Sequence, residues 1–214
     1  MWPHISVKYP QYVYTTSGWI QVIDVPNYNP KRLQVFIVPH SHQDPGWIET
    51  FEGYYQSYTK KTLNNIVSFL SKNPTWKFIW SEIIFLEKWF REPSSQTVEF
   101  KRLVANGQLE IVTGGWVMAD EAVTHFSAML DQLVEGHLWL RQNLGITPNV
   151  SWSVDPFGHS PTMTYLLKEA GMDKMVIQRV HFGIKRHLAQ RQQLEFLWRQ
   201  TWGGYAGTNV WKQN

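Results

Sequence analysis

Two side chains in the segment 40–47, HSHQDPGW, have the types and the spacing of a metal-binding pair. His42 stands two residues before Asp44, and side chains at positions i and i+2 of an extended chain point to the same face. The imidazole and the carboxylate can therefore converge on one ion. The competing interpretation makes His40 and His42 surface loop histidines and makes Asp44 the cap of the turn at Pro45-Gly46.

An alternation of strands and helices must position this pair. Short apolar runs predict buried β-strands at 34–38, 77–80, 109–112, 151–154 and 174–177. Apolar side chains with helical spacing predict helices at 54–72, 85–90, 95–105, 124–143, 162–170 and 188–198. Five strands that alternate with helices favour the α/β class, with a parallel sheet or barrel and helices outside it.

Polar residues recur where the predicted strands end. In parallel α/β folds the sites form at the carboxyl ends of strands, and here those ends carry His42 and Asp44, Glu82, Gly114-Gly115-Trp116, Asp155 and Arg179. If the first strand lies near the fourth, Asp155 joins His42 and Asp44 around one ion. An imidazole and two carboxylates suit Zn²⁺ among several divalent ions. His159 is a candidate fourth ligand, although a core or capping role fits it better.

Composition narrows the classes of function. The 214 residues include no cysteine, so there is no disulfide framework, and any metal must be held by His and carboxylate side chains. The net charge of +3 is small and spread out, which argues against nucleic acid as a partner. No apolar run is long enough for a transmembrane segment, and no signal sequence or anchor is visible. The sequence does not determine whether the chain forms a homo-oligomer.

Two reactions would suit such a site. In one, the metal activates a water molecule, as in metal-dependent hydrolases. In the other, Asp155 attacks carbon directly, and a cation beside it keeps the carboxylate ionised. The spacing of the residues does not choose between these reactions.

Several motifs together carry a family resemblance. They are HSHQDPGW at 40–47, TGGWVMADEA at 113–122, WSVDPFGHSPTM at 152–163 and QRVH at 178–181. Two further segments carry the same resemblance, FIWSEI at 78–83 and LEFLWRQ at 194–200. This sequence resembles glycoside hydrolase family 38, the class II α-mannosidases, and is closest in pattern to the Golgi branch. The resemblance extends from about residue 33 to about residue 202.

The resemblance implies a parallel (β/α) barrel-like catalytic domain with a Zn²⁺ ion in its sugar pocket. His42 and Asp44 correspond to zinc ligands of the family, and Asp155 corresponds to the carboxylate that is both zinc ligand and nucleophile. Trp47 and Phe157 match aromatic residues of the pocket, and Arg179 matches a polar one. For Trp47, the alternative is a packed core tryptophan.

The implied activity is retaining hydrolysis of α-linked mannose during N-glycan processing in the Golgi. Retention requires a second carboxyl group as general acid and base. In the family that aspartate, and a histidine that is the fourth zinc ligand, come from later segments that have no counterpart here. Asp120 and Glu82 are the substitutes to consider, although capping roles suit both better.

The chain is therefore expected to be a truncated catalytic domain. Residues 1–31 form an irregular N-terminal arm with at most a hairpin, residues 32–202 are the partial catalytic domain, and 203–214 are an atypical Gly-rich tail. We expect little or no activity from this chain alone. The alternatives are a non-catalytic fragment that binds zinc and mannose, a metal-dependent carbohydrate deacetylase, and a poorly folded splice product.

Overall fold

The computed structural model describes residues 13–15, 18–20, 37–191, 193–198 and 211–212. Most of the predicted arm at 1–31, residues 34–36 of the first predicted strand and most of the tail at 203–214 lie outside these ranges. A short antiparallel hairpin does occur within the arm, formed by β1 (Val13–Thr15) and β2 (Gly18–Ile20).

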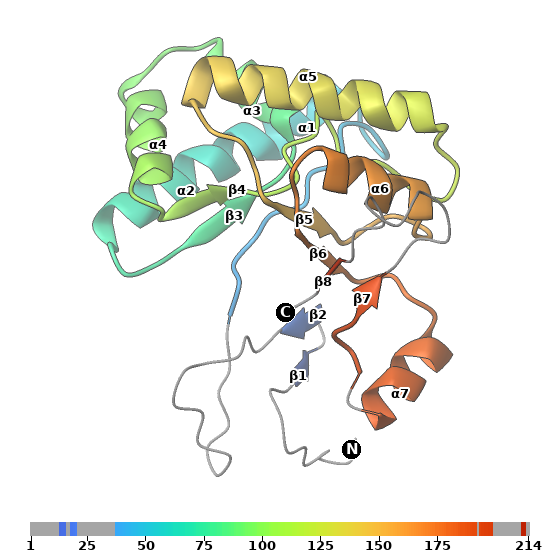
Figure 1. Ribbon diagram of the computed structural model, residues 1–214. Helices are drawn as coiled ribbons and strands as arrows, with labels where there is room; N and C mark the ends of the chain where they lie inside the picture. Colours follow the sequence, from blue (N-terminus) through green and yellow to red (C-terminus); the bar gives the residue numbers. More distant parts are fainter. Residues whose placement is uncertain (1–12, 16–17, 21–36, 192, 199–210, 213–214) are drawn as a thin grey trace.

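Helices are the most abundant regular structure in the described chain (Figure 1). They are α1 (Phe51–Tyr54), the π-helical turn η1 (Tyr55–Thr59), α2 (Lys60–Lys72), α3 (Ile83–Phe90), α4 (Ser95–Ala105), α5 (Phe126–Leu144), α6 (Pro161–Glu169) and α7 (Phe182–Gln190). The remaining strands are β3 (Phe78–Trp80), β4 (Leu109–Ile111), β5 (Val150–Ser153), β6 (Lys174–Ile177), β7 (Leu197–Trp198) and β8 (Trp211–Lys212).

The short strands after residue 37 are joined in chain order. His40 forms a parallel bridge with Ile79, β3 pairs with β4 in parallel, and β5 pairs with β6 in parallel. Thr113 connects the two pairs, because its N–H donates to the Val150 carbonyl at 2.8 Å and its hydroxyl accepts from the Trp152 N–H at 2.7 Å. The predicted α/β class with parallel strands is confirmed. Among the described residues these strands do not close into a barrel.

Local signals explain where the helices begin and end. The Ser94 side chain accepts from the Thr97 N–H at the start of α4, and the Thr97 hydroxyl accepts from the Ser94 N–H in return, which forms a capping box. Gly145 ends α5 in the left-handed region with φ +68°, as its type allows. The predicted helix ends at residues 72, 105 and 143 therefore lie within one residue of the ends in the structure.

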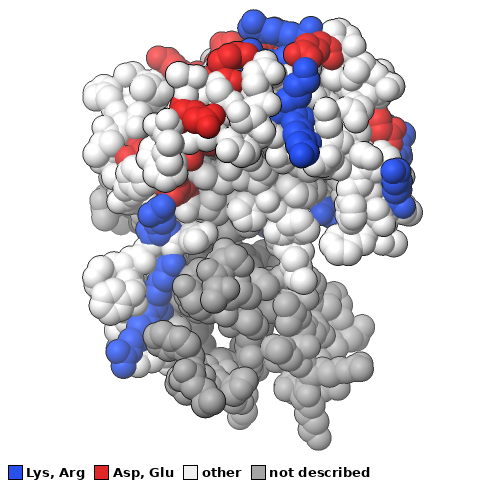
Figure 2. Space-filling model, turned by 180° about the vertical axis from the view of Figure 1, so that it is seen from behind, with Lys and Arg blue, Asp and Glu red and all other residues white. Residues whose placement is uncertain are grey.

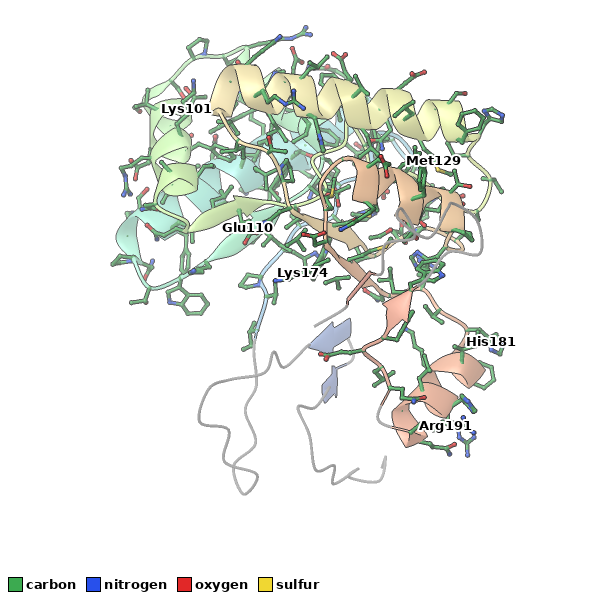
Figure 3. The ribbon with its side chains drawn as sticks, in the orientation of Figure 1. Lys101, Glu110, Met129, Lys174, His181 and Arg191 are labelled. Carbon is green, nitrogen blue, oxygen red and sulfur yellow. The ribbon has the colours of Figure 1, made fainter. Side chains whose placement is uncertain are left out.

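Two apolar clusters hold these elements together. The larger one packs α2, α3 and α4 against β3 and β4, and its fully buried side chains include Trp80, Phe85 and Phe100. The smaller one joins α5 and α6, because Met129 of α5, labelled in Figure 3, belongs to the same cluster as Met163 and Leu167 of α6. Trp80 of β3 and Ile111 of β4 belong to the larger cluster, and Met175 of β6 belongs to the smaller one, so packing holds these strands in place.

Two predicted elements differ from the structure. The helix expected at 188–198 is wrong, because α7 ends at Gln190 and residues 197–198 form β7, which pairs with the distant β8. The run at 34–38 was expected to be a buried strand, yet Ile37 is 74% exposed and regular pairing is absent at the described residues 37–39. The hydrogen bond to β3 begins at Pro39, whose carbonyl accepts from the Ile79 N–H at 3.1 Å.

Lys and Arg side chains lie among Asp and Glu side chains over the upper part of the face seen in Figure 2, and further Lys and Arg side chains lie at its lower left. The mixture agrees with the small net charge of +3 and gives no support for a polyanionic partner at that face. No helix within the described ranges combines the length and the apolarity that crossing a membrane requires.

Candidate metal centre

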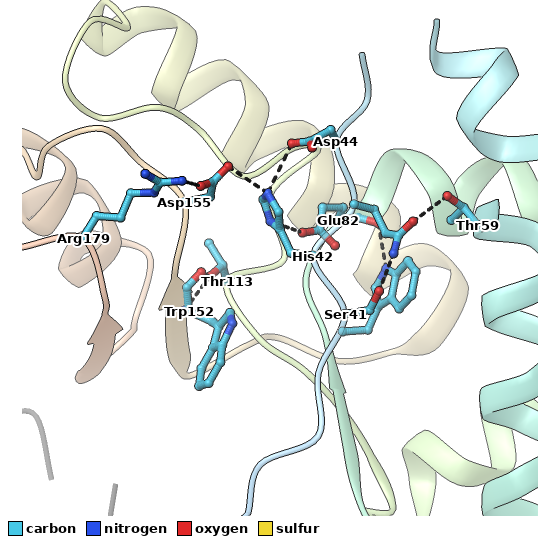
Figure 4. Close-up of polar contacts among 11 residues, drawn as sticks. Ser41, His42, Asp44, Thr59, Glu82, Thr113, Trp152, Asp155 and Arg179 are labelled. Carbon is cyan, nitrogen blue, oxygen red and sulfur yellow. Dashed lines mark hydrogen bonds and ion pairs between the residues drawn. The ribbon is translucent and has the colours of Figure 1, made fainter. Parts of the chain in front are cut away.

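His42, Asp44 and Asp155 converge at the ends of two separate segments (Figure 4). The His42 Nε2 atom lies 3.2 Å from Asp44 Oδ1 and 3.2 Å from Asp155 Oδ2. One ligand atom from each residue can be chosen so that all three lie within 4.8 Å of one another. Asp155 stands two residues after the end of β5, so the fold brings to the His42–Asp44 pair a carboxylate that is 113 positions away from His42.

The short segment that carries the first two donors is attached to a helix through Gln43. The Gln43 side-chain amide donates to the Ser41 hydroxyl, and its carbonyl accepts from the buried Thr59 hydroxyl at 2.7 Å. Thr59 belongs to the π-helical turn η1, a local irregularity of the kind that is frequent at functional sites. The sequence does not predict the contact between Gln43 and Thr59, because the two residues are 16 positions apart and no local pattern links them.

Glu82 lies behind the His42 ring. Its carboxylate is completely buried, and Oε1 lies 3.5 Å from His42 Nδ1, on the edge of the ring opposite the two aspartates. Burial raises the pKa of Glu82 even though its contact with His42 lowers it. An outer carboxylate that orients a metal-binding imidazole is a common feature of metal sites. This placement does not suit Glu82 as a proton donor to a group beside Asp155.

The surroundings of His42 favour its positive form in the metal-free chain. Burial by itself lowers the pKa of His42. The 3.5 Å contact with Glu82 and its charge, with the charges of Asp44 and Asp155, outweigh burial and raise that pKa to about 9. In the absence of a metal ion, the imidazolium therefore neutralises part of the negative charge that three carboxylates bring to this site.

Asp155 divides its two oxygens between different partners. Oδ2 faces His42, whereas Oδ1 accepts a hydrogen bond from the Arg179 guanidinium. The guanidinium also lies over the Phe157 ring, 5.3 Å from its centroid, and that ring is 71% exposed. The structure thus groups three sequence-predicted residues, Asp155, Phe157 and Arg179, on one side of His42.

Trp47 is not a core residue. Its side chain is 77% exposed in the turn that follows Asp44, which leaves the indole free to contact a ligand. An exposed aromatic face beside a polar site is common where flat apolar surfaces of ligands bind.

The two remaining candidates lie elsewhere. His159 is outside the group formed by His42, Asp44 and Asp155, and its Nδ1 lies 3.4 Å from Glu121 Oε1 instead. Asp120 caps neighbouring backbone, since Oδ1 accepts from the Phe157 N–H at 2.9 Å and from the Ala122 N–H at 3.2 Å. These contacts agree with the structural roles that were the alternatives for both residues.

The donor set fits a divalent metal ion. Two carboxylates and one imidazole are hard to intermediate donors that Zn²⁺ and related ions accept. The His42 Nε2 atom lies 3.2 Å from one oxygen of each aspartate, which is close to the spacing of neighbouring ligands on one tetrahedral ion with bonds of about 2 Å. Within the described residues this group offers three side-chain ligands, one fewer than the four of a tetrahedral zinc site.

The chain is similar in sequence to a known protein family and to several of its members. A model of the glycosyl hydrolases family 38 N-terminal domain matches residues 32–212. Alpha-mannosidase 2 of Rattus norvegicus is 53% identical over 199 residues, which cover 90% of this chain and 17% of the relative. Alpha-mannosidase 2 of Drosophila melanogaster is 51% identical over 194 residues, 90% of this chain and 18% of that protein. The chain thus spans less than a fifth of the length of these relatives.

Solved structures agree on the fold. A protein in glycosyl hydrolase family 38 from Enterococcus faecalis matches with a TM-score of 0.58 and 17% identity, over 82% of this chain and 18% of that one. The 4-alpha-glucanotransferase from Thermococcus litoralis matches with a TM-score of 0.59 and 21% identity, over 82% of this chain and 26% of that one. Because the sequence match covers most of the chain and ties it to a defined set of relatives, the chain belongs to glycosyl hydrolase family 38.

Proposed function

We propose that the described residues form the metal-holding part of a glycosidase active site that acts on α-linked mannose of N-glycans. His42, Asp44 and Asp155 hold Zn²⁺ in this proposal. The observation that carries it is the meeting of these three donors within 4.8 Å, on a chain whose relatives are named alpha-mannosidase 2. When bound, the zinc ion would supply a Lewis acid that holds neighbouring sugar hydroxyl groups.

Asp155 is the nucleophile in the proposed reaction. One carboxylate oxygen forms a bond to the anomeric carbon as the bond from that carbon to the leaving oxygen breaks, and water later hydrolyses the glycosyl ester with net retention. Arg179 holds Oδ1 and His42 faces Oδ2, so contacts on both oxygens fix the orientation of the carboxylate. Preorganisation of this kind lowers the cost of reaching the reactive geometry.

The aromatic side chains would bind the sugar. Trp47 and Phe157 are both largely exposed and follow Asp44 and Asp155 by three and two positions. Each can cover an apolar sugar face while the polar groups between them orient the hydroxyls. The cation of Arg179 over Phe157 limits the motion of that ring.

The general acid is proposed to come from another part of the full family domain. Retaining glycosidases need two carboxyl groups about 5–5.5 Å apart. Of the nearby carboxylates, Asp44 is a proposed ligand, Glu82 is buried behind His42, and Asp120 caps backbone groups. We therefore propose that residues 32–202 are part of a barrel-like catalytic domain of a Golgi enzyme, flanked by an arm at 1–31 and a tail at 203–214, with little activity alone.

The test combines metal analysis with an activity assay on the purified 214-residue chain. After dialysis against buffer that contains a trace of zinc, we expect about one equivalent of bound zinc per chain. We expect turnover of p-nitrophenyl α-mannoside to stay close to the uncatalysed rate. A chain that binds no zinc would contradict the proposed centre. Robust zinc-dependent turnover would show instead that the general acid lies within this chain.

Zinc affinity is expected to rise with pH. The proton and the metal compete for the Nε2 atom of His42, whose pKa is raised to about 9, so the metal-free chain keeps this proton at neutral pH. Displacing one proton makes the apparent affinity increase about tenfold per pH unit below pH 9 and level off above it. Competition with a chelator at several pH values, corrected for protonation of the chelator, measures the slope. A flat profile between about pH 6.5 and pH 8.5 would contradict the ligand role of His42.

A further inference from the structure

Glu121 inserts a buried carboxylate against the segment that carries Asp155. It lies between β4 and α5 and is only 4% exposed. Its Oε1 accepts a hydrogen bond from the Ser153 hydroxyl at 2.8 Å, and its Oε2 accepts one from the Ser160 N–H at 2.9 Å. Ser153 is the last residue of β5 and Ser160 is the N-cap of α6. One carboxylate thus joins both ends of the connection that contains Asp155.

Neighbouring contacts strengthen the same connection. Asp120, the preceding residue, accepts from the Phe157 N–H at 2.9 Å, which lies between the two points held by Glu121. The His159 Nδ1 atom lies 3.4 Å from Glu121 Oε1. A Cβ added at Gly158 would approach the Ala122 Cβ to 3.2 Å, so the two segments are in close contact there.

A buried carboxylate with two donors imposes tighter geometry than a single hydrogen bond. Both of its oxygens are used, and removal of either partner would leave a buried polar group without compensation. Any displacement of Asp155 relative to the loop after β4 would stretch one of these bonds. The chain segment that carries Asp155 is therefore held two residues before Asp155 and five residues after it, by bonds that do not involve the metal-binding donors themselves.

We infer that Glu121 is a positioning residue that holds the Asp155 carboxylate in register with His42 and Asp44. This inference rests on the proposed function, because it takes His42, Asp44 and Asp155 to be the ligands of a metal ion. Glu121 itself is separate from the three donor residues and would act only through the 153–160 segment. Its loss should loosen that segment first and weaken the metal centre as a consequence.

The experiment compares Glu121→Gln with the wild-type chain in two measurements. A glutamine side chain has a single acceptor oxygen, so it cannot accept from both Ser153 and Ser160 in the present arrangement. We expect faster amide hydrogen exchange in residues 155–160, with unchanged exchange in α2. We also expect the zinc dissociation constant to rise about 10- to 100-fold, as for other losses of supporting contacts around metal ligands.

A spectroscopic measurement separates positioning from general destabilisation. The visible absorption of Co²⁺ in place of zinc depends on ligand geometry, so a shifted spectrum in folded Glu121→Gln would report displaced ligands. The control is Glu135→Gln, which removes the same charge from an exposed position of α5 and should retain the wild-type values. Ser153→Ala removes a single hydrogen bond, and it provides a milder test if Glu121→Gln fails to fold.

The outcomes are distinguishable. Unchanged amide exchange in folded Glu121→Gln and in Ser153→Ala would overturn the inference. So would faster exchange with wild-type zinc affinity and cobalt spectrum, because the segment would then be loosened without consequence for the donors. If the wild-type chain binds no metal, the proposed function fails, and the exchange measurement alone decides whether Glu121 holds the segment.

Discussion

His42→Ala is expected to reduce zinc affinity on the order of 100-fold or more. Binding free energies of about 10–16 kcal/mol for structural zinc sites, shared among four ligands, correspond to roughly 2.5–4 kcal/mol for each ligand. His42 contributes more than an average donor here, because its Nε2 atom lies 3.2 Å from both aspartates and holds them at one point. Competition with a fluorescent chelator, together with metal content after dialysis, measures the loss.

The comparison requires a folded variant and a matched control. Burial raises the pKa of Glu82, so that carboxyl group can take up a proton once its imidazole partner is removed. Circular dichroism should therefore show a folded His42→Ala chain, and the double variant with Glu82→Gln removes any remaining buried charge. His187→Ala removes an exposed imidazole from α7 and should bind zinc like the wild type. Retention of wild-type affinity by His42→Ala would exclude the proposed centre.

Gly136→Ala is expected to destabilise the fold by about 3 kcal/mol or more, at or beyond the upper end of ordinary overpacking effects. A Cβ at this position of α5 would stand 2.1 Å from the Gly114 carbonyl oxygen and 2.8 Å from the Gly115 carbonyl carbon. Both atoms belong to backbone that follows β4, and the Trp116 N–H already donates to the Gln132 carbonyl of α5 at 2.8 Å. The loop cannot retreat without breaking this bond.

Thermal unfolding measures this effect directly. For a chain of this size, about 3 kcal/mol corresponds to a decrease in melting temperature of roughly 6–12 °C. Gly53→Ala in α1 is the matched control, since the new Cβ would meet only side-chain atoms of Glu49 and Thr50, the nearest at 3.1 Å. Equal melting temperatures for Gly136→Ala and the wild type would show that α5 and this loop can separate at little cost.

The same contact links the fold to the site. Backbone carbonyls of Gly115 and Trp116 accept from the Ile83 and Ile84 N–H groups at the start of α3, directly after Glu82. Gly136 allows α5 to press this loop against the end of β3, where Glu82 supports His42. Weaker packing between α5 and this loop is therefore expected to displace Glu82 and, through Glu82, the His42 ring.

Local sequence signals determined most of the helices and part of the site. Helix ends at Asn73, Asn106 and Gly145 follow from residues within one turn of each end. The pairing of His42 with Asp44 follows from their two-residue spacing, and Asp155 from its place after an apolar strand. Each of these inferences depends on neighbours close in the chain, where backbone geometry leaves few alternatives.

Tertiary structure alone decided the features that join distant segments. It placed Glu82 behind His42, joined Glu121 to both ends of the 153–160 segment, and paired β7 with β8 where helical spacing predicted a helix. It also left Ile37 exposed, although its apolar type predicted burial. The physical reason is that burial and pairing depend on partners tens of residues away. Residue types reveal which contacts a side chain can make, whereas packing selects the contacts that form.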